Sequence, residues 1–368
     1  MKILLKTLLI LFAVMPFATV QCKYYLAMKS SYQTKIWEMK KGNWKDMGIN
    51  IGLSFSIAFS PQIKGKYYFA STKEKSEKIK IWNIADLIKK KSPREIKTEG
   101  EPIEITFSPD GKFLASLENI GYNIKIEIFR FTKDGNWVKD EKFKQDYYFG
   151  PMSIAFSSDG KYFVSGSFNG NIQIWNTNDW SKNRKLEHDG AVEVIGFSPQ
   201  IKGKYYLASA GGKEIKIWNP TDNWKVVKTK SLSRVILKPK KVLSLAFSPD
   251  GKYFAYGLND ANIEICDTKT WEKFKKVLKN RLSVDSLAFS PKDKSGKYYL
   301  VSGTREVRIW DPKKNWKNIK NLKQNKFYGH SQITSLAFSQ EIKKYGLREK
   351  DVEERIGYVV EEMIKEKE

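Results

Sequence analysis

The chain has 368 residues, of which 66 are Lys or Arg and 41 are Asp or Glu, so its formal net charge is +25. It contains only two His and two Cys, which excludes a zinc-type cluster and a disulfide framework. The positive charge has two possible explanations, attraction to a polyanion and a general richness in Lys. We favour the second, because Lys is spread through the whole chain, whereas nucleic-acid binders usually concentrate Arg and stacking aromatic residues on one element.

The N-terminus has the pattern of a signal peptide. Lys2 and Lys6 precede or border an apolar stretch from Leu8 to Val20, which is shorter than the ~20 residues of a membrane-spanning helix. We therefore expect residues 1–22 to be a signal peptide that is cleaved after Gln21 or Cys22, leaving a secreted or exported chain without a transmembrane span. A lipid anchor on Cys22 and an uncleaved anchor remain alternatives.

A tandem repeat occupies the rest of the chain. An AFSP-like motif returns about every 45 residues, a period typical of stacked small sheets. The marker Phe residues of this motif are Phe59, Phe107, Phe156, Phe197, Phe247, Phe289 and Phe338.

Each repeat has the same order of predicted strands. An alternating run such as 244–248 is followed by a Pro/Asp/Gly turn and an aromatic run such as 252–255. A third alternating run ends in Trp, and a second Trp, such as Trp224 or Trp316, begins a fourth run. Period-2 runs rich in β-branched and aromatic residues predict strands, so each repeat should be one four-stranded antiparallel sheet.

These motifs resemble the WD-repeat family of β-propellers. The family's hallmarks are the AFSPDG turn and a Trp-Asp or Trp-Asn pair that ends the third strand, here at Trp82, Trp175, Trp218 and Trp310. The resemblance covers residues 23 to 339. It implies a propeller domain over that range and a rigid, non-catalytic platform for protein or peptide partners, although this fold hosts many unrelated roles.

The number of blades follows from the two ends of the repeat. There are seven first-strand motifs, but nothing after Phe338 resembles a second, third or fourth strand. Those strands stand at the other end of the chain, at 23–27, 34–37 with Trp37, and 43–44. We therefore predict an all-β, seven-bladed propeller that is closed by pairing its C-terminal first strand with its N-terminal strands, which removes exposed sheet edges.

The resemblance also implies structural roles for particular side chains. The family's buried polar network joins a His before the first strand, a turn Asp, a Ser or Thr on the second strand, and the Trp. Only His188 and His330 could fill the His position, in the blades of Trp218 and Trp37. Cys266 stands in the Trp position of one blade, and Phe129 or Phe131 stands there in another. The expected structural residues are Trp37, Trp82, Trp175, Trp218, Trp310, His188 and His330.

Residues 340–368 form a charged tail. Its apolar residues follow helical spacing, which predicts a short C-terminal helix that packs on the propeller; a partner-binding helix is the alternative. These residues are Val352, Ile356, Val359, Val360 and Met363.

Strand alternation assigns the connections to two faces. The turns between strands one and two and between strands three and four share a Lys-rich face, with Lys64, Lys202 and Lys252 among them. The other face carries the more variable loops, which should hold the partner-binding residues. The candidates are Tyr147, Tyr148, Phe149, Arg234, Arg281, Arg305 and Tyr328.

The sequence thus favours a non-catalytic, monomeric protein- or peptide-binding scaffold without a cofactor, a metal or catalytic residues. One alternative is binding of nucleic acid or another anionic surface through the Lys-rich face. The other is a hydrolase with a site in the central channel that uses His188 or His330.

Overall fold

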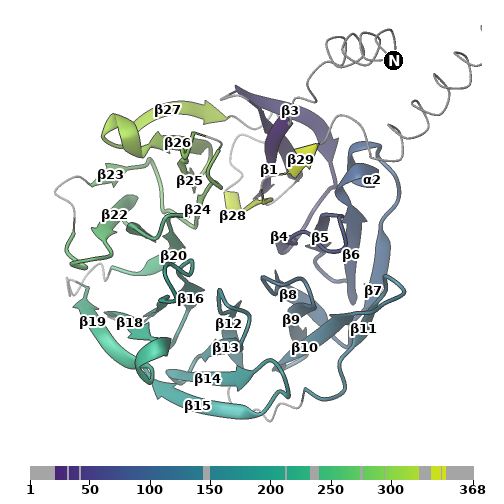
Figure 1. Cartoon of the computed structure of the whole chain (residues 1–368), viewed down its shortest axis with the longest axis horizontal. Helices are drawn as coiled ribbons and strands as arrows, with labels where there is room; N and C mark the ends of the chain where they lie inside the picture. The colour runs from purple at the N-terminus through teal and green to yellow at the C-terminus, as the bar shows by residue number, and fades with distance from the viewer. Residues whose placement is uncertain are drawn as a thin grey trace, which may run out of the picture.

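Seven blades surround a central opening in the computed structural model (Figure 1). The structure describes residues 21–30, 33–40, 43–143, 150–211, 214–232, 240–273, 277–293, 295–322, 333–340 and 342–344. Within each blade the strands run antiparallel from the innermost to the outermost. The predicted seven-bladed all-β propeller is therefore confirmed.

The blades are numbered here from the one that joins the two ends of the chain. Blade 1 contains β28 (Ile333–Phe338), β1 (Gln21–Ser30), β2 (Thr34–Lys40) and β3 (Asn43–Asn50). Blade 2 contains β4 (Ile57–Phe59), β5 (Tyr68–Thr72), β6 (Lys78–Asn83) and β7 (Arg94–Lys97), and blade 3 contains β8 (Glu101–Phe107), β9 (Phe113–Ile120), β10 (Asn123–Phe131) and β11 (Trp137–Lys139). Blade 4 contains β12 (Pro151–Phe156), β13 (Tyr162–Ser167), β14 (Asn171–Asn176) and β15 (Lys182–Glu187).

The remaining blades continue around the ring. Blade 5 contains β16 (Val194–Phe197), β17 (Leu207–Gly211), β18 (Glu214–Asn219) and β19 (Lys225–Ser231). Blade 6 contains β20 (Val242–Phe247), β21 (Tyr253–Leu258), β22 (Asn262–Asp267) and β23 (Leu278–Lys279). Blade 7 contains β24 (Ser286–Phe289), β25 (Leu300–Gly303), β26 (Val307–Asp311) and β27 (Lys317–Leu322).

The described helices are short. Helix α2 (Ile84–Ile88) joins β6 to β7, and 3₁₀ turns η1 (Pro220–Asp222) and η2 (Pro312–Lys314) make the same connection in blades 5 and 7. No helix in the described part of the chain is long and apolar enough to cross a membrane.

The ring closes through strands from opposite ends of the chain. Strand β28 pairs with β1, with Leu26 opposite Phe338, and the Tyr25 backbone N–H donates to Ser339 Oγ at 2.8 Å. An additional short strand, β29 (Ile342–Lys344), pairs with the beginning of β1. This strand lies within the tail for which a helix is predicted, and the helical apolar pattern from Val352 to Met363 lies outside the described residues.

The strand register shows which residues fill the third-strand Trp position. Trp82, Trp175, Trp218 and Trp310 each lie opposite an apolar residue of the second strand and are buried. In blade 3 the position belongs to Phe129, opposite Leu114, which decides between Phe129 and Phe131. In blade 6 it belongs to Cys266, opposite Phe254.

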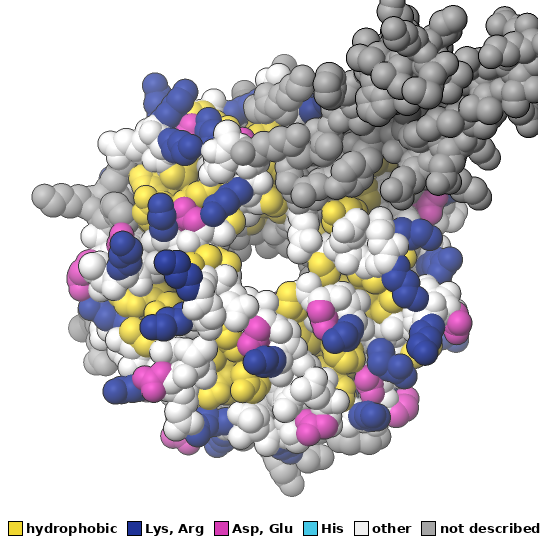
Figure 2. All heavy atoms as spheres, in the orientation of Figure 1, with side chains coloured by type: hydrophobic (Ala, Val, Ile, Leu, Met, Phe, Trp, Pro, Cys, Tyr) yellow, Lys and Arg dark blue, Asp and Glu magenta, His cyan; other side chains and the backbone are white. Residues whose placement is uncertain are grey.

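The two faces of the ring differ in the connections they carry. Thr177 N in the β14–β15 turn donates to Lys161 O in the β12–β13 turn at 2.9 Å, so both kinds of turn share one face, which we call the basic face. The same two kinds of turn also meet between blades 2 and 3, where the Lys64 side chain donates from its Nζ to Lys133 O at 2.7 Å. The opposite side, with the connections between strands two and three and between successive blades, is called the loop face. On the side shown in Figure 2, Lys and Arg side chains surround the central opening with Asp and Glu between them.

Candidate partner-binding surface

Arg281 and Arg305 are the two candidate binding residues that the structure describes. Arg281 lies in the connection from β23 to β24, and Arg305 lies in the turn between β25 and β26. Both are exposed on the loop face. The other candidates, Tyr147, Tyr148, Phe149, Arg234 and Tyr328, lie outside the described residues.

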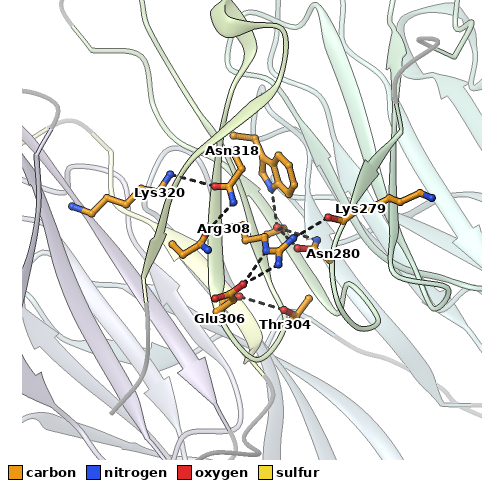
Figure 3. A network of polar contacts seen from close by, with 10 residues as sticks. Lys279, Asn280, Thr304, Glu306, Arg308, Asn318 and Lys320 are labelled. Atoms are coloured by element: carbon orange, nitrogen blue, oxygen red, sulfur yellow. Dashed lines mark hydrogen bonds and ion pairs between the residues drawn. The ribbon is translucent and has the colours of Figure 1, made fainter. Parts of the chain in front are cut away.

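A network of hydrogen bonds holds the two segments that carry these arginines (Figure 3). Asn280 Nδ2, next to Arg281, donates to Ser302 Oγ at 3.2 Å, and Trp310 Nε1 donates to the same oxygen at 2.9 Å. The Arg308 guanidinium donates to Glu306 Oε1 at 3.0 Å and to Lys279 O at 2.9 Å. Because the network spans blades 6 and 7, it fixes the base of the Arg281 connection relative to the Arg305 turn.

Asn280 occupies the position that the family pattern gives to His. Lys279 pairs with Asn262 in blade 6, and Asn280 follows directly; in blade 4, Glu187 pairs with Asn171, and His188 follows directly. Asn280 is not predicted from the sequence, because the family pattern has His at this position. The shared context, Leu-Lys-Asn at 278–280 and Leu-Glu-His at 186–188, could have revealed it.

His188, in the connection from blade 4 to blade 5, is buried rather than exposed to a ligand. Neither ring nitrogen has a hydrogen-bond partner among the described residues, and Nδ1 lies 3.7 Å from Glu214 Oε1. Burial lowers the pKa of His188, which favours the neutral ring. The indole of the same blade makes the expected kind of contact, since Trp218 Nε1 donates to Ser209 Oγ at 2.8 Å.

The other structural candidates lie between blades. Trp37 is partly buried against the cluster that joins blades 7 and 1, and Trp175 is 1% exposed. The Nε1 atoms of Trp37 and Trp175 have no hydrogen-bond partner among the described residues, so these two indoles contribute through packing. His330 lies outside the described residues.

Exposed hydrophobic side chains on the loop face were not found by the sequence analysis. Tyr122 and Phe168, in the turns between strands two and three of blades 3 and 4, are 107% and 66% exposed. Leu53 and Phe55, in the connection from blade 1 to blade 2, and Met152, near the loop-face end of β12, are also exposed. For Tyr122 and Phe168 the sequence signal is an apolar residue inside a turn.

A buried carboxyl pair stands beside the connection between blades 2 and 3. Glu118 and Glu127 are 0% and 2% exposed, and they accept hydrogen bonds from Gly100 N at 3.1 Å and Glu99 N at 3.3 Å. Burial, reinforced by the charge of Glu127, raises the pKa of Glu118 to about 8. The raised pKa favours the protonated form of Glu118.

Lysines bind the outer side of this pair. Lys139 Nζ lies 2.7 Å from Glu127 Oε1 and also pairs with Glu99. Hydrogen bonds from Lys125 and Lys139 lower the pKa of Glu99 to about 2. Glu99 lines two adjacent open depressions of about 410 Å³ and 780 Å³, whose walls hold charges of both signs.

Another carboxyl with a raised pKa lies on an innermost strand. Glu104, on β8, accepts a hydrogen bond from Ile154 N of blade 4 at 3.3 Å. Ser56 and Ser153 make the same bond from their blades to the next, to Ile105 N at 3.2 Å and Ile195 N at 3.3 Å. Burial raises the pKa of Glu104 to about 8.

Comparison with known proteins supports the repeat assignment. Residues 148–176 and 232–267 match the family model described as WD domain, G-beta repeat. No curated protein is significantly similar to the chain. In the described ranges no group of three or more His, Cys, Asp or Glu residues could hold a metal ion.

Proposed function

Because the chain belongs to the WD40-repeat family, whose propellers are usually non-catalytic interaction scaffolds, we propose that it is an exported, non-catalytic platform that binds a protein or peptide partner through its loop face. The proposal goes beyond the fold, which many functions share. It depends on what the loop face exposes.

The distribution of exposed apolar side chains carries the proposal. Five of the ten large hydrophobic side chains that are exposed in the described part of the chain lie on the loop face, and all five belong to blades 2 to 4 or the connections that enter them. Aromatic residues and Arg contribute most to interface energies, and Tyr122 and Phe168 are rigid aromatic groups with few rotatable bonds. Such groups bind with little loss of conformational entropy.

A matched pair of variants tests the loop face. The first replaces Phe55, Tyr122 and Phe168 with Ala, and the second replaces the exposed outer-strand residues Val226, Val227 and Ile319 with Ala. We expect partner capture from the exported fraction to fall at least tenfold for the first variant, as for loss of an interface hot spot, and to persist for the second. Equal capture by both variants and the wild type would exclude this surface.

Export has its own test, because it is supported by the sequence pattern alone. Intact mass measurement of the chain recovered from the exported fraction should show loss of residues 1–21 or 1–22. A full-length mass would instead favour an uncleaved anchor, and an added lipid mass on Cys22 would favour the lipid-anchored form.

A further inference from the structure

The basic face presents a lysine side chain to solvent on every blade. Each of these residues is exposed and lies in or next to a turn of this face. One representative from each of the blades 1 to 7 is Lys40, Lys66, Lys112, Lys161, Lys204, Lys252 and Lys313.

In blades 3 and 6 an aspartate of the same face is held by its own turn. Asp110 Oδ1 accepts hydrogen bonds from Ser108 Oγ at 2.7 Å and Lys112 N at 3.1 Å, and Asp250 has the same contacts in blade 6. Even where they approach these aspartates, Lys112 and Lys252 keep 70% and 68% of their side-chain surface exposed. The carboxylates therefore face the backbone while the ammonium groups remain available.

The aromatic residues of the turns point inward. Trp180, Trp224, Trp271 and Trp316 adopt positive φ angles between 57° and 59°, yet all four are less than a tenth exposed. Positive φ is unfavourable for bulky residues, and here it accompanies burial of the indole. These turns therefore lack the aromatic platforms on which single-stranded nucleic acids stack.

The arrangement of the charges distinguishes a flat surface from a linear polymer. The lysines follow the circumference of the whole ring instead of lining one groove, and they are point charges rather than bidentate guanidinium groups. A planar array of this kind can contact a planar anionic surface with all blades at once, whereas a linear polymer would reach only part of it.

The chain path points to the same surface. Strand β1 starts on the basic face, because it is the second strand of its blade and runs from the basic face toward the loop face. The apolar stretch from Leu8 to Val20 directly precedes this strand in the sequence. A stretch of that kind associates with membranes during export, and the strand that follows it begins on the basic face.

We propose that the basic face lies on an anionic lipid bilayer, with lysines of all seven blades near the headgroups and the loop face directed away from the membrane. This inference is independent of the partner-binding proposal, since it concerns the opposite face. Each Lys near an anionic bilayer adds favourable electrostatic energy that salt screens.

Vesicle sedimentation of the chain recovered from the exported fraction tests the proposal. Vesicles of equal parts phosphatidylglycerol and phosphatidylcholine are compared with vesicles of phosphatidylcholine alone. We expect binding to the anionic vesicles only, and a loss of binding when the salt concentration rises from about 0.1 M to about 0.5 M. Equal binding to the neutral vesicles would overturn the proposal, because it would assign binding to apolar insertion.

Two charge-matched variants locate the binding to a face. One replaces Lys66, Lys161, Lys204 and Lys313, on four blades of the basic face, with Glu. The control replaces four exposed lysines of the loop face, Lys73, Lys75, Lys142 and Lys241, with Glu. We expect the vesicle partition coefficient to fall about 100-fold or more for the first variant and less than about threefold for the control.

Three further outcomes bear on the membrane proposal. Equal losses in the two variants would show that net charge alone controls binding. Retention on heparin or DNA without binding to anionic vesicles would assign the face to a linear polyanion. If the Glu substitutions unfold the chain, the four Lys→Gln substitutions replace them, with an expected loss of about tenfold.

Discussion

Blade 7 and blade 3 hold their entering connections in place by different chemistry. In blade 7, neutral groups do this: Ser302 accepts from both Trp310 and Asn280. In blade 3 the Trp position holds Phe129, and Ser116 Oγ has no hydrogen-bond partner among the described residues. Buried carboxyls take over there, since Glu118 and Glu127 accept from the backbone of the connection at Gly100 and Glu99.

The entering connections of these two blades are thus held by hydrogen bonds from different residue types. A neutral clamp has the same strength across the physiological pH range, whereas a carboxyl clamp depends on its protonation state. We therefore expect the two blades to respond differently to truncation and to pH.

Truncation of the blade 7 indole should have the largest effect. Trp310 is 6% exposed, so we expect Trp310→Ala to cost roughly 3 to 5 kcal/mol, as for other large-to-small core changes. Trp310→Phe keeps most of the packing and should cost about 1 kcal/mol for the lost hydrogen bond to Ser302. Urea unfolding measures both; similar costs for the two variants would show that the hydrogen bond, not packing, dominates.

The carboxyl clamp should make blade 3 sensitive to pH. The pKa of Glu118 is about 8 in the folded chain and about 4.3 when unfolded, so the folded state binds more protons between these values. Stability should therefore fall as pH rises from about 4 to about 8 and then level off. Glu118→Gln imitates the protonated acid, and we expect it to stabilise the chain by about 2 kcal/mol at pH 8.5 but little at pH 5.

Glu104 supplies the control for this measurement, because its pKa is also raised to about 8 in a different environment. The Glu104→Gln variant should flatten part of the same pH profile independently. If the urea midpoint of the Glu118→Gln variant follows the wild-type pH profile, the carboxyl pair in blade 3 does not carry the proposed proton.

Blade 6 offers a third arrangement and a smaller effect. The register places Tyr256 and Cys266 at the positions of Ser209 and Trp218 in blade 5. Both are buried in one cluster. Tyr256 is larger than Ser209 and Cys266 is smaller than Trp218, so the two differences in volume offset each other. We expect Cys266→Trp to cost about 1 to 3 kcal/mol by overpacking, and the addition of Tyr256→Ser to recover part of it. Additive thermal shifts in the double variant would contradict this exchange of volume.

Removal of the hydrogen bond between Asn280 and Ser302 should have the smallest effect on stability. Asn280→Ala removes one hydrogen bond to Ser302 and should cost about 1 kcal/mol in urea unfolding. Asn280→His restores the residue type that the family pattern favours, and we expect it to be better tolerated than the Ala variant. A His variant that is less stable than the Ala variant would show that blade 7 has no room for the imidazole.

The architecture could be predicted because its determinants are local and repeated. The alternating runs that end at Trp82, Trp175, Trp218 and Trp310 specify the third strand of four blades. No strand motifs follow Phe338, so the strand that ends there must pair with strands from the N-terminus. The position of Cys266 followed from the same register.

The polar clamps and the exposed patch depend on contacts between blades, which a single repeat does not encode. Asn280, Glu118 and Glu127 acquire their roles from neighbouring strands, and no residue-type pattern marks them. Tyr122 and Phe168 are exposed only if no adjacent connection covers their turns. The length of a connection does not determine whether it covers a turn.

Ring closure has a consequence for the newly made chain. Tyr25 and Ser339, which meet in the finished ring, are 314 positions apart, a distance that takes roughly 15 to 60 seconds to synthesise at 5 to 20 residues per second. During that interval the inner edge of β1 has no partner, and unpaired strand edges promote association between chains. We expect fragments that stop before Phe338 to be aggregated or degraded rather than to persist as six-bladed rings.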